Sequence, residues 1–197
     1  LIHDGYWEAG EYKCGYTGEY KDAKRNGYGK ETDLNGNTYE GDWKDDSRHG
    51  KGKEYDKNGT LVHEGVWENG YWNYSYTGDY IDGKKHGHGT YKDKTGVTYE
   101  GDWKNDRMDG NGVWTKDGAT YTGAFAAGQK SGYGTMKYSN GDVYAGNFNY
   151  DKKNGQGTFT STGKKYTGLY KDDKKHGRGT EENSYGKYDG DWVNDKK

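Results

Sequence analysis

The chain has 197 residues, of which 36 are glycine and none is proline, and its formal net charge at neutral pH is −2. Leu, Ile, Val and Phe together number only 15, too few for a conventional aliphatic core, whereas 22 Tyr and 7 Trp are more than disordered chains carry. The composition argues against an ordinary globular enzyme and against disorder, and it indicates a core of aromatic rings and glycine.

In chain order the sequence is a series of related units. Full units begin with tyrosine and recur every 22 to 24 residues, a period typical of repeat proteins. Two short units of 13 residues interrupt the series, at 3–15 (HDGYWEAGEYKCG) and 63–75 (HEGVWENGYWNYS). The full units begin at Tyr16, Tyr39, Tyr76, Tyr99, Tyr121, Tyr144 and Tyr166, and a partial unit covers 188–197. Because the chain opens on the tail of one unit and stops within another, we expect it to be an excerpt of a longer protein.

Each unit predicts a β-hairpin. In residues 39–43 (YEGDW) the tyrosine, glycine and tryptophan share one face of a strand, while the two acids share the other. The second strand is expected to begin at Gly50-x-Gly52, after a charged loop. Tight turns are expected at dipeptides that favour them, namely Asn35-Gly36, Asn58-Gly59, Asp117-Gly118 and Asn140-Gly141, and at Ala9-Gly10 and Asn69-Gly70 in the short units.

The first and fifth residues of the units are expected to form the core. The fifth residue is aromatic in every full unit, and the glycine between the two rings offers flat backbone on which they can lie. A single hairpin is marginal in water, so we expect stability from stacking neighbouring units. The expected repeat core comprises Tyr39, Gly41, Trp43, Tyr99, Gly101, Trp103, Tyr121, Phe125, Tyr144, Phe148, Tyr166 and Tyr170.

The pattern Y-x-G-x-W/Y/F, a charged stretch, G-x-G and a closing glycine, with HGKG, HGHG and HGRG variants, resembles the MORN (membrane occupation and recognition nexus) repeat. The resemblance covers nearly the whole chain as a single array over 1–197. It implies an all-β fold, an elongated solenoid of stacked antiparallel β-hairpins forming one twisted sheet. The two short units and the Ala126-Ala127 pair in place of charges depart from the pattern.

The charged stretches run from acid to base, and stacking is expected to place them along one edge. Such a row of bases could attract anionic lipid or a protein partner, although the neighbouring acids weaken its field. A sequence pI of about 6.3 gives no basic footprint for nucleic acid. The candidate residues are Lys84, Lys85, Lys152, Lys153, Lys174 and Lys175.

No motif for catalysis, cofactor or metal emerges. Gly-x-Gly lacks the helix and the Gly-Lys-Ser/Thr sequence that a phosphate loop needs. His86 and His88 are two residues apart, but no Cys or carboxylate at zinc spacing accompanies them. Cys14 stands alone, so no internal disulfide can form. We expect no catalytic, cofactor-binding or metal residues in this segment.

The leading hypothesis is a non-catalytic scaffold that mediates protein-protein interaction or self-association along its aromatic-glycine groove and sheet edges. The resemblance adds two alternatives: peripheral binding to anionic phospholipids such as phosphoinositides, and a regulatory or targeting arm of a larger enzyme such as a phosphatidylinositol-phosphate kinase or a SET methyltransferase. A cytoplasmic location is expected, with the cytoskeleton, the cilium or a membrane as sites of attachment.

Overall fold

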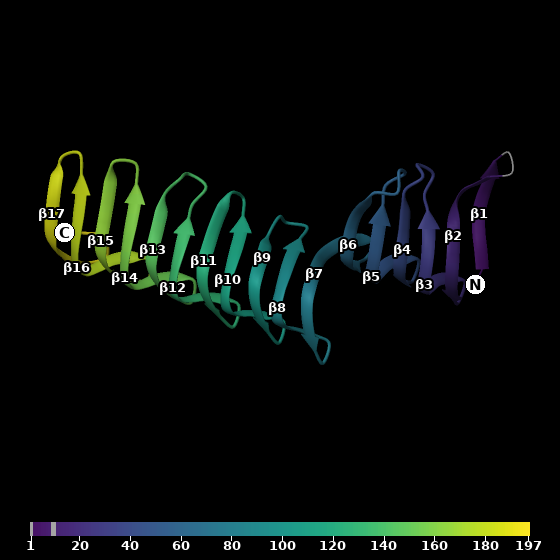
Figure 1. Cartoon of the computed structure of the whole chain (residues 1–197), viewed down its shortest axis with the longest axis horizontal. Coiled ribbons are helices and arrows are strands. Elements are labelled where there is room, and N and C mark those ends of the chain that lie inside the picture. Colours follow the sequence, from purple (N-terminus) through teal and green to yellow (C-terminus); the bar gives the residue numbers. More distant parts are fainter. Residues whose placement is uncertain (1, 9–10) are drawn as a thin grey trace. The chain divides into compact units, whose positions relative to one another are not determined.

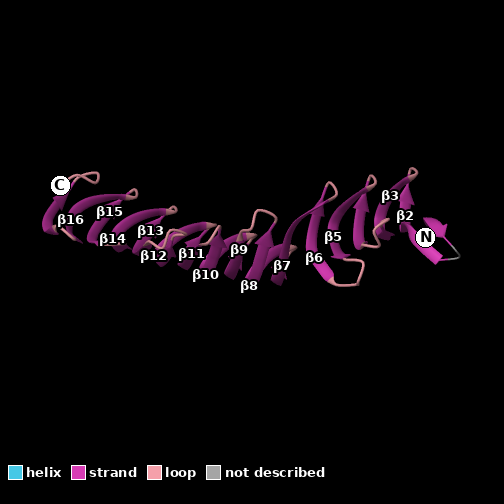
Figure 2. Ribbon diagram, turned by 90° about the horizontal axis from the view of Figure 1, so that it is seen from above, coloured by secondary structure: helices cyan, strands magenta, loops and turns pink. Residues whose placement is uncertain are grey.

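The computed structural model describes residues 2–8 and 11–197, and side chains from residue 15 onward. This part of the chain forms seventeen β-strands and no helix, as the hairpin periodicity predicts. Figures 1 and 2 show their arrangement. The chain divides into two compact units, residues 1–76 and 77–197. In each unit the described pairings are antiparallel and join strands that follow one another in the sequence, so the sheet consists of successive hairpins and is not closed into a barrel.

The first unit contains six complete strands, and each described pairing joins neighbours in the chain. A seventh strand, β7 (Tyr71–Ile81), carries the chain into the second unit. The six are β1 (Ile2–Glu8), β2 (Glu11–Lys21), β3 (Lys24–Thr32), β4 (Thr38–Lys44), β5 (Ser47–Tyr55) and β6 (Leu61–Glu68). The turn predicted at Ala9-Gly10 lies outside the described residues, as do the side chains of His3 and Cys14.

The second unit repeats the hairpin with less interruption, and Figure 2 shows that its strands curve along their length. Its strands are β8 (Lys84–Asp93), β9 (Thr98–Lys104), β10 (Arg107–Lys116), β11 (Ala119–Ala126), β12 (Gln129–Lys137), β13 (Val143–Asn149), β14 (Lys152–Ser161), β15 (Lys164–Lys171), β16 (Lys174–Asn183) and β17 (Gly186–Trp192).

The second strand of a hairpin begins earlier than Gly50-x-Gly52 predicts. In the unit that starts at Tyr39, β5 already begins at Ser47, directly after the two-residue turn Asp45-Asp46. A bulge around Gly50, whose φ is +61°, lets the charged residues pair with the end of β4 and then bends the strand. The expected charged loop is therefore mostly strand. The bulge accommodates the extra residues that interrupt the alternation of side chains between the two faces of the sheet.

The turns are of two kinds. Asp117-Gly118 and Asn69-Gly70 are two-residue turns with both residues at positive φ, as predicted. Asn35-Gly36, Asn58-Gly59 and Asn140-Gly141 lie inside five-residue loops, where each glycine amide donates to the carbonyl three residues before it, at 3.0, 2.9 and 2.9 Å. The predicted turns are therefore present, although these connections are longer than two residues. In the first of these, the Asp33 carboxylate accepts hydrogen bonds from the main-chain amides of Asn35 and Asn37 at 2.8 and 2.9 Å, which stabilises the longer loop.

The core is a row of aromatic rings that lie on glycine. Gly41 of β4 is directly opposite Gly52 of β5, and the ring of Tyr39 covers both. An added Cβ at Gly41 would lie 2.7 Å from the Tyr39 hydroxyl, so no larger residue fits beneath the ring. The ten aromatic residues expected in the repeat core are all buried, whereas the fifth-position Tyr80 is 45% exposed.

Candidate functional site

We call the side of the sheet that carries these rings the inner face. In the second unit an edge-to-face ladder runs without a break from Trp103 to Trp192, with neighbouring ring centroids 5.1–5.4 Å apart. Each ring inside the ladder touches one ring of its own repeat and one of an adjoining repeat. Such pairs contribute about 0.5–1.5 kcal/mol each beyond area burial. The ladder therefore couples each repeat to its neighbours.

The polar ends of many core side chains bond to the backbone, whereas the buried indole nitrogen of Trp67 has no hydrogen-bond partner among the residues that the structure describes. The Tyr121 hydroxyl donates to the carbonyl of Ala124 at 2.9 Å, and the Trp103 indole donates to the carbonyl of Gly89 at 3.1 Å. Burial, with a smaller contribution from Asp151, raises the pKa of Tyr121 to about 12. These hydroxyls stay protonated at neutral pH and act as structural donors.

Basic side chains lie over the rings as a second layer. The guanidinium carbon of Arg25 is 4.2 Å from the centroid of Trp43, and the Lys175 ammonium is 4.4 Å from that of Trp192. The same position in each unit carries a basic residue, except that Met108 stands there in the unit that begins at Tyr99. These cover cations, as we name them, are Arg25, Arg48, Lys85, Lys130, Lys153, Lys175 and Lys197.

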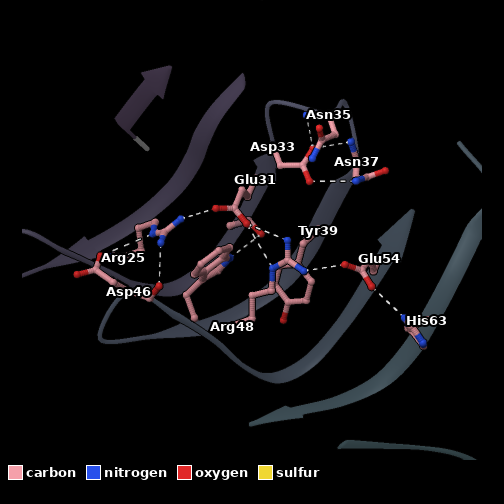
Figure 3. Close-up of polar contacts among 12 residues, drawn as sticks. Arg25, Glu31, Asp33, Asn35, Asn37, Tyr39, Asp46, Arg48, Glu54 and His63 are labelled. Carbon is pink, nitrogen blue, oxygen red and sulfur yellow. Dashed lines mark hydrogen bonds and ion pairs between the residues drawn. The ribbon is translucent and has the colours of Figure 1, made fainter. Parts of the chain in front are cut away.

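In the first unit the cover cations belong to a chain of ion pairs (Figure 3). Arg25 pairs with Glu31 at 2.7 Å, and Arg48 bridges Glu31 at 3.0 Å and Glu54 at 2.8 Å. His63 Nδ1 lies 2.9 Å from the second oxygen of Glu54 and ends the chain. The inner face of this unit is consequently polar above its aromatic floor.

A similar acid lies near the end of the second unit. Glu181 is buried and pairs with Lys175, with Lys164 at 3.0 Å and with Lys197 at 3.4 Å. Burial by itself would raise the pKa of Glu181, but the hydrogen bonds from Lys175 and Lys164 outweigh it and lower the pKa to about 2. This acid is ionised at neutral pH and ties three lysines to the inner face.

One position of the repeat is apolar in the middle of the sequence. The residues opposite the buried tyrosines are Tyr91, Trp114, Met136 and Phe159, which we call the apolar strip. All four side chains are half-buried. The equivalent positions nearer the two ends of the chain hold Glu31, Glu54 and Glu181. In sequence order this position of the repeat thus changes from charged to apolar and back.

The six candidate lysines separate into two groups. They begin strands β8, β14 and β16 rather than lying in loops. Lys84, Lys152 and Lys174 are exposed beside the turns, whereas the second lysine of each pair is a cover cation. Lys85, for example, lies 5.3 Å from the Trp103 centroid, and desolvation lowers its pKa despite the raising effect of Asp106.

The acids of the charged stretches hold one repeat to the next. Asp46 accepts a hydrogen bond from the Arg25 amide at 2.9 Å through its carboxylate, and its own amide donates to the Arg25 carbonyl at 3.1 Å. Both residues of its turn have positive φ, a strained conformation for non-glycine residues that these bonds offset. The same contact recurs in later units. We name these residues turn aspartates: Asp46, Asp106, Asp151, Asp173 and Asp195.

Two hollows lie beside consecutive turns of the second unit. The first, of about 280 Å³, is next to Met108 and lined by Tyr99, Trp103, Lys85 and Arg107 among others. The second, of about 450 Å³, is lined by Lys84, Lys104, Asn105, Arg107, Asp109 and Ala127. We call them the Met108 pocket and the turn notch, and Arg107 lines both.

The side chains described from residue 15 onward form no metal cluster, and residues 2–8 and 11–197 contain no spanning helix. No group of three or more His, Cys, Asp or Glu side chains among those described is arranged to hold a metal ion. His88 Nδ1 lies 3.3 Å from Asp102 on an exposed surface. No helix in the described chain is long and apolar enough to cross a membrane.

Comparison with known proteins agrees with this geometry. A family model described as the MORN repeat matches eight segments, and no curated protein matches the chain. The segments are 16–38, 39–61, 76–98, 99–120, 121–143, 144–163, 166–183 and 188–197, and no catalytic domain is found in the chain. These segments account for most of the sequence, and each opens on a ladder or repeat tyrosine. The chain belongs to the MORN repeat family.

Proposed function

We propose that this chain is a non-catalytic scaffold that binds another protein, or a second copy of itself, on the inner face of its second unit. The apolar strip carries the proposal. Trp114 and Phe159 each lie beside a cover cation, with ring centroids 5.1 and 5.5 Å from the ammonium groups of Lys130 and Lys153. Half-buried aromatic and methionine side chains bordered by charge are typical of protein interfaces.

The ladder tyrosines themselves cannot supply that surface. Tyr99, Tyr121 and Tyr144 are at most 1% exposed, so an aromatic-glycine groove in which a partner touches these rings is excluded by their burial. A partner would meet the layer above them instead, formed by the apolar strip and the aliphatic stems of the cover cations. Such stems bury well against apolar groups while the charge stays in water.

The chemistry of the remaining polar groups supports a binding role over catalysis. The turn aspartates hold backbone amides, the tyrosine hydroxyls donate to carbonyls, and Glu181 is enclosed by lysines. Groups committed to structure in this way are not positioned to act on a substrate. What varies along the array is the surface above the core, which suits recognition of a partner.

A photocrosslinking experiment tests this proposal on the whole chain. Benzoylphenylalanine at position 114 is expected to form a discrete adduct with one protein, or with the chain itself, in an extract of the native source. The same probe at Val113 is the matched control, because this neighbour points to the opposite face of β10 and is 38% exposed. Equal adducts at both positions, or none at position 114 together with a monomer in sedimentation velocity, would contradict the proposal.

Binding to anionic phospholipid is the second candidate, and the exposed Lys84, Lys152 and Lys174 favour it. Their field is limited, since Lys152 lies 3.8 Å from Asp172 and each turn carries further acids. Sedimentation with phosphoinositide-containing vesicles at low salt is the test, because electrostatic attachment is strongest there. Absence of binding under that condition ends this candidate.

A further inference from the structure

The turn notch is formed by three turns of the second unit, those after β7, β9 and β11. The start of β8 pairs with the turn after β9, where the Lys85 amide donates to Asp106 at 2.9 Å. The turn after β11 lies beside β10 in the same way, since the Gly128 amide donates to the carbonyl of Met108 at 2.8 Å. These contacts fix the positions of the residues between them, so the notch is a defined feature of the sheet edge.

Three cations line the notch without a counter-ion. Lys84, Lys104 and Arg107 are exposed, and none forms an ion pair among the residues that the structure describes. The one acid that lines it, Asp109, accepts a hydrogen bond from the Ala127 amide at 3.1 Å. The turn after β11 contributes Ala127 and Gly128, whereas the turns after β13 and β15 carry Asp151, Asp172 and Asp173. An excess of positive charge is thus concentrated in one place.

The corresponding hollow of the first unit shows what is unusual here. It lies between turns in the same manner and has a similar volume of about 480 Å³. Its lining includes Asp22, Asp42 and Asp45 against Lys21 and Lys44, so its charges nearly cancel. The notch of the second unit therefore has a charge balance that the repeat pattern does not require.

The Met108 pocket lies directly beside the notch and is apolar at its floor. Met108 stands where the other units have a cover cation, so this unit adds no cation of its own, and Lys85 of the preceding unit is the cation that lies over Trp103, at 5.3 Å. Methionine adapts its shape to an incoming apolar group and is common at binding surfaces. Arg107 lines both hollows, so an anionic group in the notch and an apolar group in the pocket would be neighbours.

We propose that the turn notch binds an anionic side chain of a partner protein, a phosphate monoester or a carboxylate, and that an adjacent apolar side chain of that partner enters the Met108 pocket. Guanidinium and ammonium donors converging on one point are suited to such groups. An extended anionic membrane would also meet acids along the turn edge, among them Asp82 and Asp172, whereas a discrete anionic group meets only the notch. This inference rests on the proposed scaffold function.

The first test uses two small probes on the whole chain, inorganic phosphate and phenyl phosphate, in a nuclear magnetic resonance titration at low salt. Both are expected to shift the backbone amides of Lys84, Lys104 and Arg107 selectively. Phenyl phosphate is expected to bind more tightly and to shift the Trp103 indole signal as well. Absence of selective shifts overturns the notch, and equal binding of the two probes overturns the role of the Met108 pocket.

The second test uses charge reversal. Arg107→Glu and Lys84→Glu are each expected to weaken phenyl phosphate binding about tenfold or more. Lys152→Glu is the matched control, an exposed lysine at the same hairpin position that faces Asp172, and it is expected to leave binding unchanged. Equal losses in Arg107→Glu and Lys152→Glu, in this titration or with phosphoinositide vesicles, would overturn the notch in favour of a diffuse anionic surface.

Failure of this inference is distinguishable from failure of the scaffold function. A partner crosslinked at position 114 whose binding is unchanged by Arg107→Glu removes the notch and leaves the scaffold intact. Loss of that partner in Arg107→Glu but not in Lys152→Glu supports both. A chain that crosslinks to no protein yet binds phenyl phosphate as described overturns the scaffold and reduces the notch to an adventitious anion site, which also overturns the inference.

Discussion

Replacing Gly41 with alanine tests the packing of rings on glycine. The new Cβ would lie 2.5 Å from the Cα of Gly52 on the neighbouring strand and 2.7 Å from the Tyr39 hydroxyl. The first contact is with backbone, which cannot turn away, so the strands must separate or the ring must lift. Tyr39 would then lose its 3.0 Å hydrogen bond to the Asp42 carbonyl and its edge contacts with neighbouring indoles.

The expected cost follows from these losses. Overpacking of a tight site costs about 1–3 kcal/mol, the hydrogen bond about 1 kcal/mol, and part of the aromatic contacts is lost as well. The free energy of unfolding should therefore fall by about 3–5 kcal/mol. Urea unfolding followed by near-ultraviolet circular dichroism measures the total, and hydrogen exchange in residues 39–61 locates it.

Gly59→Ala is the control from the same repeat. Its φ is +80°, but an added Cβ meets nothing within 4 Å, so we expect only the conformational cost of about 1 kcal/mol. The two substitutions separate two reasons for glycine. Gly41 is needed because there is no space for a side chain, and Gly59 because its backbone has a positive φ. A loss in Gly59→Ala equal to or larger than that in Gly41→Ala would refute the reasoning.

Three further changes test the contacts around the core. Tyr121→Phe removes the hydroxyl that donates to Ala124 and should lower the free energy of unfolding by about 1 kcal/mol in urea denaturation. Because the pKa of Glu181 in the folded chain is about 2, below its ordinary 4.5, its ion pairs stabilise the fold above pH 4.5 and are lost as the pH falls toward 2; Glu181→Gln should flatten this part of the acid unfolding curve. The Asp151 carboxylate accepts a hydrogen bond from the Lys130 amide at 2.9 Å. Asp151→Ala should therefore speed hydrogen exchange at this amide, as measured by nuclear magnetic resonance.

Each of these has its own control and contrary result. Tyr133→Phe, at a side chain 66% exposed, should leave stability unchanged, and an equal loss there would deny the buried hydroxyl its role. If the acid unfolding curve of Glu181→Gln were the same as that of the unmodified chain, the neighbouring lysines would not be stabilising the ionised carboxylate of Glu181. Tyr150→Ala changes the neighbouring turn residue, which is 70% exposed, and comparable exchange in both turn variants would mean that loop flexibility rather than the carboxylate protects Lys130.

The fold was accessible from sequence because its determinants are local and periodic. The alternation of Tyr39, Gly41 and Trp43 specifies one face of a strand, and the recurrence of this triplet specifies hairpins that stack. The structure and the family match confirm the all-β hairpin array and the MORN repeat. The length of the loop around Asn35 was not predictable in the same way, since the Asp33 side chain stabilises a five-residue connection around the turn.

The candidate lysines could be located from sequence but not assigned to a surface. Whether Lys152 or Lys153 covers a ring depends on the bulge near Gly155, which shifts the pairing of β13 with β14 and is not visible in composition. A signal did exist, because Arg48 and Lys85 occupy the same place nine residues after the first tyrosine of their units. The unpaired charges of the turn notch arise from contacts among three turns, a relation that no single repeat contains.

The turn aspartates also determine where the chain can be divided. Asp151 forms hydrogen bonds with both the main-chain amide and the main-chain carbonyl of Lys130. By sequence, Lys130 belongs to the preceding repeat. The segment that satisfies its own backbone is therefore offset from the tyrosine-to-tyrosine period by roughly one strand. A shortened chain that stops at residue 143 leaves both Lys130 groups to solvent, whereas one extended to Asp151 supplies their partners. Grafting or shuffling of these repeats should accordingly follow the turns rather than the tyrosines.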